Sequence, residues 1–198
     1  MTAAAEREAL RDALLHAVTA MKAAAVPFAV TGGYALYAWG GAEPDHDADI
    51  IVERTRLDAV AQALSSAGLA IERPPEDWLL KAWWRPEGPP AFVDVIFELA
   101  GNPVDAELLA RAEPKPVFAV EAPVLPAHDV VRTKLLVLSE HSCDYTALLR
   151  AARAVREQVD WSALRRDTAT NPYAQGFLDL AERLELTGPT AGTQAGSS

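Results

Sequence analysis

The chain of 198 residues has a single cysteine, Cys143, so neither an internal disulfide nor a thiolate metal cluster can form within it. It also lacks any apolar run approaching the roughly 20 residues that a membrane helix needs. The first 21 residues carry five Asp, Glu or Arg side chains, which excludes the apolar segment of a signal peptide. We therefore expect a cytoplasmic protein without membrane association.

Basic residues are scarce, since 18 Lys and Arg stand against 28 Asp and Glu and the formal net charge is −10. This balance works against non-specific attraction to nucleic acid or to an anionic membrane. Residues 128–166 are the exception, with seven basic and five acidic side chains, and Arg150, Arg153 and Arg156 recur at helical spacing. Such a segment fits either a tRNA-binding surface or an ordinary solvated helix face.

The hydrophobic pattern divides the chain into a mixed part and a helical part. We expect helices at 2–25, 34–39 and 57–67, and strands at 28–31, 48–52, 69–72, 78–84, 91–99 and 117–120. Further helices are expected at 128–140, 145–159, 162–167 and 173–186. The predicted fold is α+β: a small mixed sheet flanked by helices (1–125), a C-terminal helical bundle (126–187) and a disordered tail (188–198).

Three aspartates are candidates for catalysis. Asp47 and Asp49 stand two residues apart at the head of an apolar strand, so their side chains point to the same face. Neighbouring carboxylates repel unless a cation lies between them, and such oxygen ligands suit Mg²⁺. Asp94 interrupts the apolar strand AFVDVIFEL and needs a partner. If the two strands are neighbours, the three carboxylates can hold two metal ions for an in-line phosphoryl transfer.

A glycine pair supplies the second part of the candidate site. Gly32 and Gly33 separate a short apolar strand from a helix, so the backbone can approach a ligand and the first N–H groups of the helix face an anion. The triphosphate of an NTP suits this position, and Tyr34 completes the candidate nucleotide-binding set. Each pattern alone also fits a turn or a helix cap, and it is their order along the chain that favours a functional site.

The segments VTGGYALYAWGGAEPDHDADIIVE and AFVDVIFE resemble the nucleotidyltransferase superfamily that includes DNA polymerase beta, the kanamycin and lincosamide nucleotidyltransferases and the AbiEii/MenT toxins. That family has an apolar strand, Gly-Gly or Gly-Ser, a short helix, Asp-x-Asp, and a third aspartate on a later strand. The matching positions here are Gly32, Gly33, Asp47, Asp49 and Asp94. The resemblance implies a mixed sheet with helices, two Mg²⁺ ions and an NTP donor.

Two positions depart from the family pattern, because many relatives carry a basic residue and a threonine where this chain has Glu43 and Asp45. The segment PAHDVVRTKLLVLSEHSCDYTALL resembles the toxin-type branch, with Lys134 and Asp144 at the matching lysine and aspartate. In that interpretation Lys134 neutralises the β and γ phosphates as pyrophosphate leaves. Asp144 orients this lysine or the acceptor.

These features predict a Mg²⁺-dependent enzyme that moves a nucleoside monophosphate from an NTP to a hydroxyl group. The toxin-type resemblance implies the 3′ end of tRNA as acceptor, CTP or UTP as donor, and an antitoxin protein as partner. Two alternatives remain open. An acidic cleft suits a small cationic acceptor of the aminoglycoside or lincosamide type, whereas Glu43 and Asp45 fit a non-catalytic nucleotide-binding antitoxin or regulator.

Overall fold

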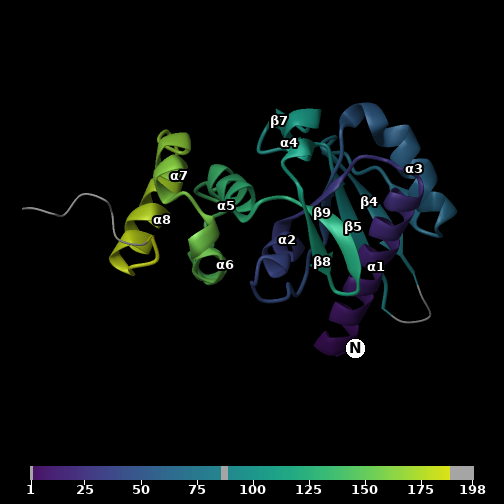
Figure 1. The fold of residues 1–198 in the computed structure, drawn as a ribbon, viewed down its shortest axis with the longest axis horizontal. Helices are drawn as coiled ribbons and strands as arrows, with labels where there is room; N and C mark the ends of the chain where they lie inside the picture. Colours follow the sequence, from purple (N-terminus) through teal and green to yellow (C-terminus); the bar gives the residue numbers. More distant parts are fainter. Residues whose placement is uncertain (1, 86–88, 188–198) are drawn as a thin grey trace, which may run out of the picture. The chain divides into compact units, whose positions relative to one another are not determined.

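The computed structural model describes residues 2–85 and 89–187, so the tail expected at 188–198 lies outside the described residues. The chain divides into two compact units, of which the first ends at Pro126 and the second begins at Ala127. The first unit contains a sheet with helices, and the second is helical (Figure 1). The predicted α+β fold class is therefore confirmed. None of the described helices is both long and apolar enough to cross a membrane.

The helices of the first unit are α1 (Ala3–Ala23), α2 (Gly32–Ala38), α3 (Leu57–Ser66) and α4 (Ala106–Ala110), with a 3₁₀ turn at Arg54–Arg56. Its strands are β1 (Ala29–Thr31), β2 (Asp49–Ile51), β3 (Ala70–Glu72), β4 (Leu79–Trp84), β5 (Ala91–Ile96), β6 (Glu98–Leu99), β7 (Asn102–Pro103), β8 (Glu113–Val117) and β9 (Val120–Val124). The second unit contains α5 (Ala127–Leu136), α6 (Tyr145–Ala154), α7 (Trp161–Asp167) and α8 (Pro172–Arg183), with a 3₁₀ turn at Arg156–Gln158.

Among the described strands, seven form one mixed sheet in the order β3-β4-β5-β2-β1-β9-β8. Strand β2 runs parallel to β5 and β1 runs parallel to β9, whereas the other neighbouring strands are antiparallel. Strands β6 and β7 pair separately. The strand that follows Asp-x-Asp therefore lies directly beside the strand that carries Asp94, as the prediction of converging carboxylates requires.

Helix α1 lies against one face of β4 and β5 (Figure 1). On this face the His16 ring of α1 stacks on Trp84 of β4, with 3.9 Å between the ring centroids. Side chains alternate along a strand, so the buried Leu80 and Ala82 point to the same face as Trp84. Lys81, which lies between them, points to the opposite face of the sheet.

The prediction of a strand at 117–120 is wrong, because this segment spans the turn of the β8–β9 hairpin. Val117 pairs with Val120, and Phe118 between them has a φ of 54° in the left-handed region. The strands on either side are hard to recognise because β8 contains Pro114 and Pro116. Proline donates no hydrogen bond to a sheet and is tolerated on an edge strand, the position that β8 occupies.

In the second unit, one asparagine connects the end of α5 to the start of α8. The side-chain amide of Asn171 donates to three carbonyl groups, those of Leu135, Leu136 and Leu138, at 3.3, 3.2 and 2.9 Å. Its side-chain oxygen accepts from the first-turn N–H groups of Tyr173 and Ala174 at 3.0 and 3.1 Å. Asn171 is therefore the N-cap of α8 and also satisfies carbonyl groups at the C-terminal end of α5.

We expect Asn171→Ala to lower the free energy of unfolding by about 2 kcal/mol, because a helix cap and several part-buried hydrogen bonds are lost together. Asn102→Ala is the matched control, since its exposed amide donates only to Ala100 O in the described structure, and it should cost less than about 0.5 kcal/mol. Urea unfolding followed by circular dichroism measures both. Equal costs for the two variants would contradict the role given to Asn171.

Candidate active site

Polar residues from five neighbouring strands form a row across the sheet. Asp49 on β2 lies opposite Thr31 on β1 and opposite Asp94 on β5. Asp94 also lies opposite Lys81 on β4, which lies opposite Glu72 on β3. Side chains of directly paired residues share one face of a sheet. The register thus brings together Asp49 and Asp94, which are 45 positions apart in the sequence.

Gly32 lies tightly against the Asp49 carboxylate. A Cβ added at this glycine would lie 1.9 Å from Asp49 Oδ2, and its φ is +61°. A Cβ at Gly33 would lie 2.7 Å from the Cβ of Pro44, in the loop that leads to β2. A larger residue at either position would push this neighbour away. The glycine pair therefore allows the start of α2 to approach both the carboxylate and the loop.

Asp94 makes an ion pair with Lys81, which the sequence analysis does not single out. Lys81 Nζ donates to Asp94 Oδ1 at 2.9 Å. The side chains are only 25% and 17% exposed, so the pair is partly shielded from water. Lys81 Nζ also lies 3.9 Å from the centroid of the Phe92 ring, a cation–π contact that holds the ammonium group in place.

Burial raises the pKa of the Asp94 carboxyl group, because desolvation disfavours the charged form. The hydrogen bond and the positive charge of Lys81 act in the opposite direction. The negative charge of Asp47 adds to the upward shift of the Asp94 pKa. Asp47 itself is exposed, two residues before Asp49. A cation near these carboxylates would relieve their repulsion.

The oxygen donors near Gly32 suit a hard cation such as Mg²⁺. Within residues 2–85 and 89–187, no three Asp, Glu, His or Cys side chains are grouped closely enough to hold an ion. Mg²⁺ commonly takes one or two carboxylates from a protein and further oxygens from substrate phosphates and water. Asp47 and Asp49, with the Gly32 backbone close against the Asp49 carboxylate, fit an ion shared with a triphosphate.

The two departures from the family pattern are ion-paired with α1. Arg11 donates to both oxygens of Glu43, with its Nη2 at 2.9 and 3.0 Å. Arg7 donates to Asp45 at 3.0 Å. Arg11 also lies over the Phe118 ring, 4.3 Å from its centroid. Glu43 and Asp45 thus connect the loop before β2 to α1, and this structural role explains the acidic residues at these two positions.

The side chain of Tyr34 is fully buried. Its ring packs edge-on against Tyr37 and Phe118, and within the described structure its hydroxyl has no hydrogen-bond partner. Burial, followed by the nearby negative charge of Glu43, raises the pKa of this hydroxyl. A contact between Tyr34 and a nucleotide would therefore have to involve the main chain of this residue.

Lys134 and Asp144 belong to the second unit, so they are not among the residues that the sheet register brings together. Lys134 is half-buried in the last turn of α5. Asp144 is the N-cap of α6 and accepts hydrogen bonds from the N–H groups of Thr146 and Ala147 at 2.8 and 3.3 Å. The capping contacts give Asp144 a structural role whether or not it also meets a substrate.

No family model matches the sequence, and no curated protein matches it. Among solved structures, the fold is similar to the solution structure of the antibiotic-resistance factor ANT(2'')-Ia, with a TM-score of 0.58 at 13% identity. That match covers 86% of this chain and 96% of the other. A crystal structure of an antigenic nucleotidyltransferase-like protein from Paracoccidioides brasiliensis aligns with a TM-score of 0.46 at 14% identity, over 89% and 88% of the two chains. The likeness to the resistance factor shows that the two chains share a fold.

We expect Gly32→Ala to disrupt the site more than a strained glycine elsewhere does. Gly101→Ala is the matched control, because Gly101 also has a positive φ, +77°, but an added Cβ there would meet nothing within 4 Å. The control should lose about 1 kcal/mol of unfolding free energy from backbone strain alone. Gly32→Ala should lose about 3 kcal/mol, because the added carbon also collides with the Asp49 carboxylate.

Urea unfolding and the binding of Mn²⁺, a spectroscopic substitute for Mg²⁺, would test this difference. Gly32→Ala should weaken Mn²⁺ binding and Gly101→Ala should leave it unchanged. Equal effects of the two substitutions on stability and on metal binding would show that the close approach of Gly32 to Asp49 has no consequence.

Proposed function

We propose that this chain is a nucleotidyltransferase, which transfers a nucleoside monophosphate from an NTP to a hydroxyl acceptor and releases pyrophosphate. One observation carries the proposal: Asp49 and Asp94 are paired in register on adjacent strands, and the Gly32 backbone lies against Asp49. The nucleotidyltransferase-like fold of the chain supports the same activity. A shared fold alone does not determine chemistry, so the proposal depends on the carboxylates.

The side chains divide the reaction between them. Asp47 and Asp49 would hold Mg²⁺ together with the phosphates of the NTP, and Gly32 allows the start of α2 to approach the Asp49 carboxylate. The bound ion would offset phosphate charge and polarise the α-phosphate. Asp94, on the strand next to Asp49, would orient the acceptor hydroxyl and accept its proton. The hydroxyl oxygen then bonds to the α-phosphorus as the bond to the leaving pyrophosphate breaks.

Charge favours a small cationic acceptor. Residues 127–187 contain eight Lys or Arg and nine Asp or Glu, and residues 188–198 contain no charged side chain. The first unit, which carries the aspartates, therefore has −9 of the net charge of −10. An acidic unit attracts a polyamine sugar and repels a polyanion. ANT(2'')-Ia, the structural relative, is an antibiotic-resistance factor, and we propose an aminoglycoside-like hydroxyl as the leading acceptor.

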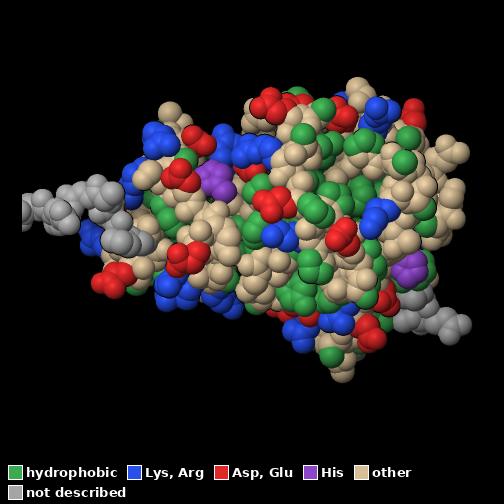
Figure 2. All heavy atoms as spheres, viewed as in Figure 1, with side chains coloured by type: hydrophobic (Ala, Val, Ile, Leu, Met, Phe, Trp, Pro, Cys, Tyr) green, Lys and Arg blue, Asp and Glu red, His purple; other side chains and the backbone are tan. Residues whose placement is uncertain are grey.

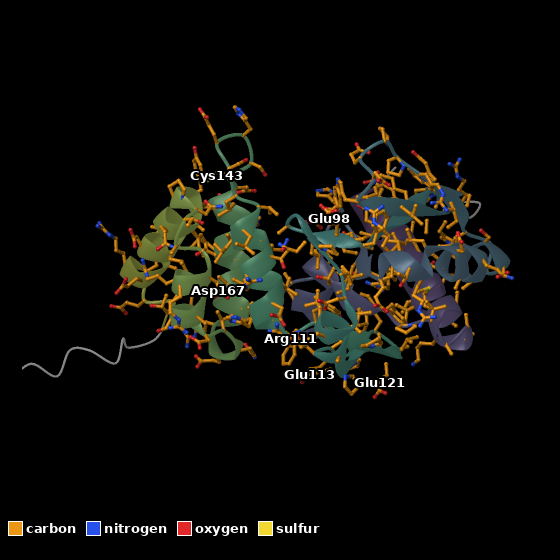
Figure 3. All side chains as sticks on the ribbon, turned by 90° about the horizontal axis from the view of Figure 1, so that it is seen from above. Glu98, Arg111, Glu113, Glu121, Cys143 and Asp167 are labelled. Carbon is orange, nitrogen blue, oxygen red and sulfur yellow. The ribbon has the colours of Figure 1, made fainter. Side chains whose placement is uncertain are left out.

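The 3′ end of tRNA is the second candidate acceptor, with CTP or UTP as donor, and the chain would then be a toxin held in check by an antitoxin. The supporting observation is a group of exposed arginines in the helical unit, Arg150 and Arg153 on α6 and Arg166 on α7. Lys and Arg side chains gather in several places over this unit (Figure 2). Other basic residues of this unit are paired with carboxylates, and Arg132 pairs with Asp167 at 2.7 Å. Asp167 is labelled in Figure 3.

In either reaction, Lys134 is proposed to neutralise the leaving pyrophosphate.

A non-catalytic binding protein is less well supported than it was by the sequence alone. Its motivation was the acidic character of Glu43 and Asp45, and both residues are engaged in ion pairs with α1. Their presence is explained by the anchoring of a loop, so it does not require a loss of catalysis.

Loss of either aspartate should abolish transfer. We expect Asp49→Asn and Asp94→Asn each to lower the rate of NMP transfer by about a hundredfold or more, since charge stabilisation at the reacting phosphate is lost. Asp12→Asn is the control, because Asp12 is an exposed residue of α1. Release of labelled pyrophosphate from each γ-labelled NTP, with a mixture of acceptors and Mg²⁺, measures the rate. Activity retained by both site variants would rule out the assignment of these carboxylates.

The acceptor is identified by the product. Incubation with an α-labelled NTP, Mg²⁺ and either aminoglycosides or total tRNA should label the small cationic sugar, visible by thin-layer chromatography. Label in the tRNA band of a denaturing gel, lost in an Arg150→Gln, Arg153→Gln double variant, would instead establish the toxin reaction. Antibiotic protection of cells on expression, as opposed to growth arrest, gives an independent readout.

A further inference from the structure

We propose that the Lys81 ammonium group is a built-in cation of the active site, so that the chain binds one divalent ion at Asp47 and Asp49 and does not bind a second at Asp94. This inference rests on the proposed nucleotidyltransferase function and deepens it. It changes the expected stoichiometry from two metal ions to one ion and one lysine.

The position of Lys81 is determined by the sheet. Strands β4 and β5 pair antiparallel, and Lys81 lies directly opposite Asp94, so the two side chains emerge side by side on the same face. The contact of 2.9 Å between Lys81 Nζ and Asp94 Oδ1 therefore follows from the strand pairing and does not depend on the flexibility of a surface lysine. Because flanking residues of both strands are buried, among them Ala82 and Val93, a slip in register would bury the charges and is disfavoured.

The Lys81 ammonium group occupies one oxygen of Asp94, namely Oδ1. A divalent ion coordinated by the same carboxylate would stand close to a fixed positive charge in a site that is partly shielded from water. The repulsion between them is greater there than it would be in bulk water. The Phe92 ring, 3.9 Å from Lys81 Nζ, favours a positive charge at this position and opposes withdrawal of the lysine.

The other two carboxylates occupy different positions in the first unit. Asp49 sits opposite Asp94 on the far side from β4, with Gly32 against its carboxylate. Asp47 lies two residues earlier on the exposed loop. The two cations of the site would then have separate places, a divalent ion near Gly32 and the ammonium group near Phe92. Lys81 acts through Asp94, so it is a positioning residue rather than one that touches the reacting atoms.

The test counts Mn²⁺ ions per chain by electron paramagnetic resonance, with a non-hydrolysable NTP analogue present. The wild type should bind one ion. Lys81→Met keeps the approximate length of the side chain and removes its charge, so this variant should bind two ions. Its affinity for the second ion should exceed that of the wild type by at least about tenfold. Lys81→Arg retains a positive charge and should again bind one.

Lys115→Met is the matched control. Lys115 on β8 likewise pairs with a carboxylate, that of Glu113 at 3.6 Å, and its Nζ lies 3.6 Å from the centroid of the Trp39 ring. Glu113 lies with Lys115 on the β8 edge strand (Figure 3), and this edge is separated from β4 by the rest of the sheet. Lys115→Met should leave the number of bound ions unchanged. A gain of an ion in this variant would mean that loss of any positive charge suffices.

Other outcomes overturn the inference in distinguishable ways. Two tightly bound Mn²⁺ ions in the wild type, unchanged in Lys81→Met, would remove the role of Lys81 and leave the nucleotidyltransferase proposal standing. If the wild type binds no Mn²⁺, both the role of Lys81 and the nucleotidyltransferase proposal are contradicted. Thermal melting of each variant separates these results from loss of the fold, and if Lys81→Met does not fold, Lys81→Gln takes its place in the same comparison.

Discussion

The pairing of Asp49 with Asp94 is the constraint around which the first unit is organised. Two carboxylates opposite each other on adjacent strands of a sheet are mutually repulsive, and burial adds a desolvation cost that is visible in the raised pKa of Asp94. Lys81 offsets part of this cost on the β4 side of the row. On the β1 side, the absence of a side chain at Gly32 leaves room for the Asp49 carboxylate. A structural protein would have little reason to keep such an arrangement, and this is the physical basis for a functional interpretation.

Helix α1 supports this arrangement in two ways. Its apolar side packs on β4 and β5, which positions the strands that carry Lys81 and Asp94. Its N-terminal half supplies Arg7 and Arg11, which hold the loop before β2 through Asp45 and Glu43. These ion pairs are partly exposed, so each contributes modestly to stability. Their combined effect is to limit the positions that the loop, and therefore Asp47, can adopt.

Much of the site could be predicted from the sequence because the residues concerned are tied to local patterns. Gly32 and Gly33 stand between an apolar strand and a helix, and Asp94 interrupts an apolar run. The pattern that identifies Asp94 also points to Lys81, because a lysine inside the strand LLKAWW is as unusual as an aspartate inside AFVDVI. The sequence does not show that these two residues are partners, since that depends on the pairing of β4 with β5. The partners of Glu43 and Asp45 could not be found in this way, since they are more than 30 positions away and belong to a helix whose orientation depends on tertiary packing. The β8–β9 hairpin is hard to predict for a different reason. Proline usually indicates a loop, but it is tolerated on an edge strand, and β8 is at the edge of the sheet.

Those prolines have a consequence for the behaviour of the protein in a crowded solution. An open sheet offers unpaired N–H and C=O groups at its two outer strands, to which a strand from another molecule can add. Here one outer strand, β3, has only three residues, and the other, β8, lacks two N–H donors at Pro114 and Pro116. Neither edge is a good template for a further strand. The prolines that make β8 hard to predict from the sequence therefore also protect the folded molecule against edge-to-edge aggregation.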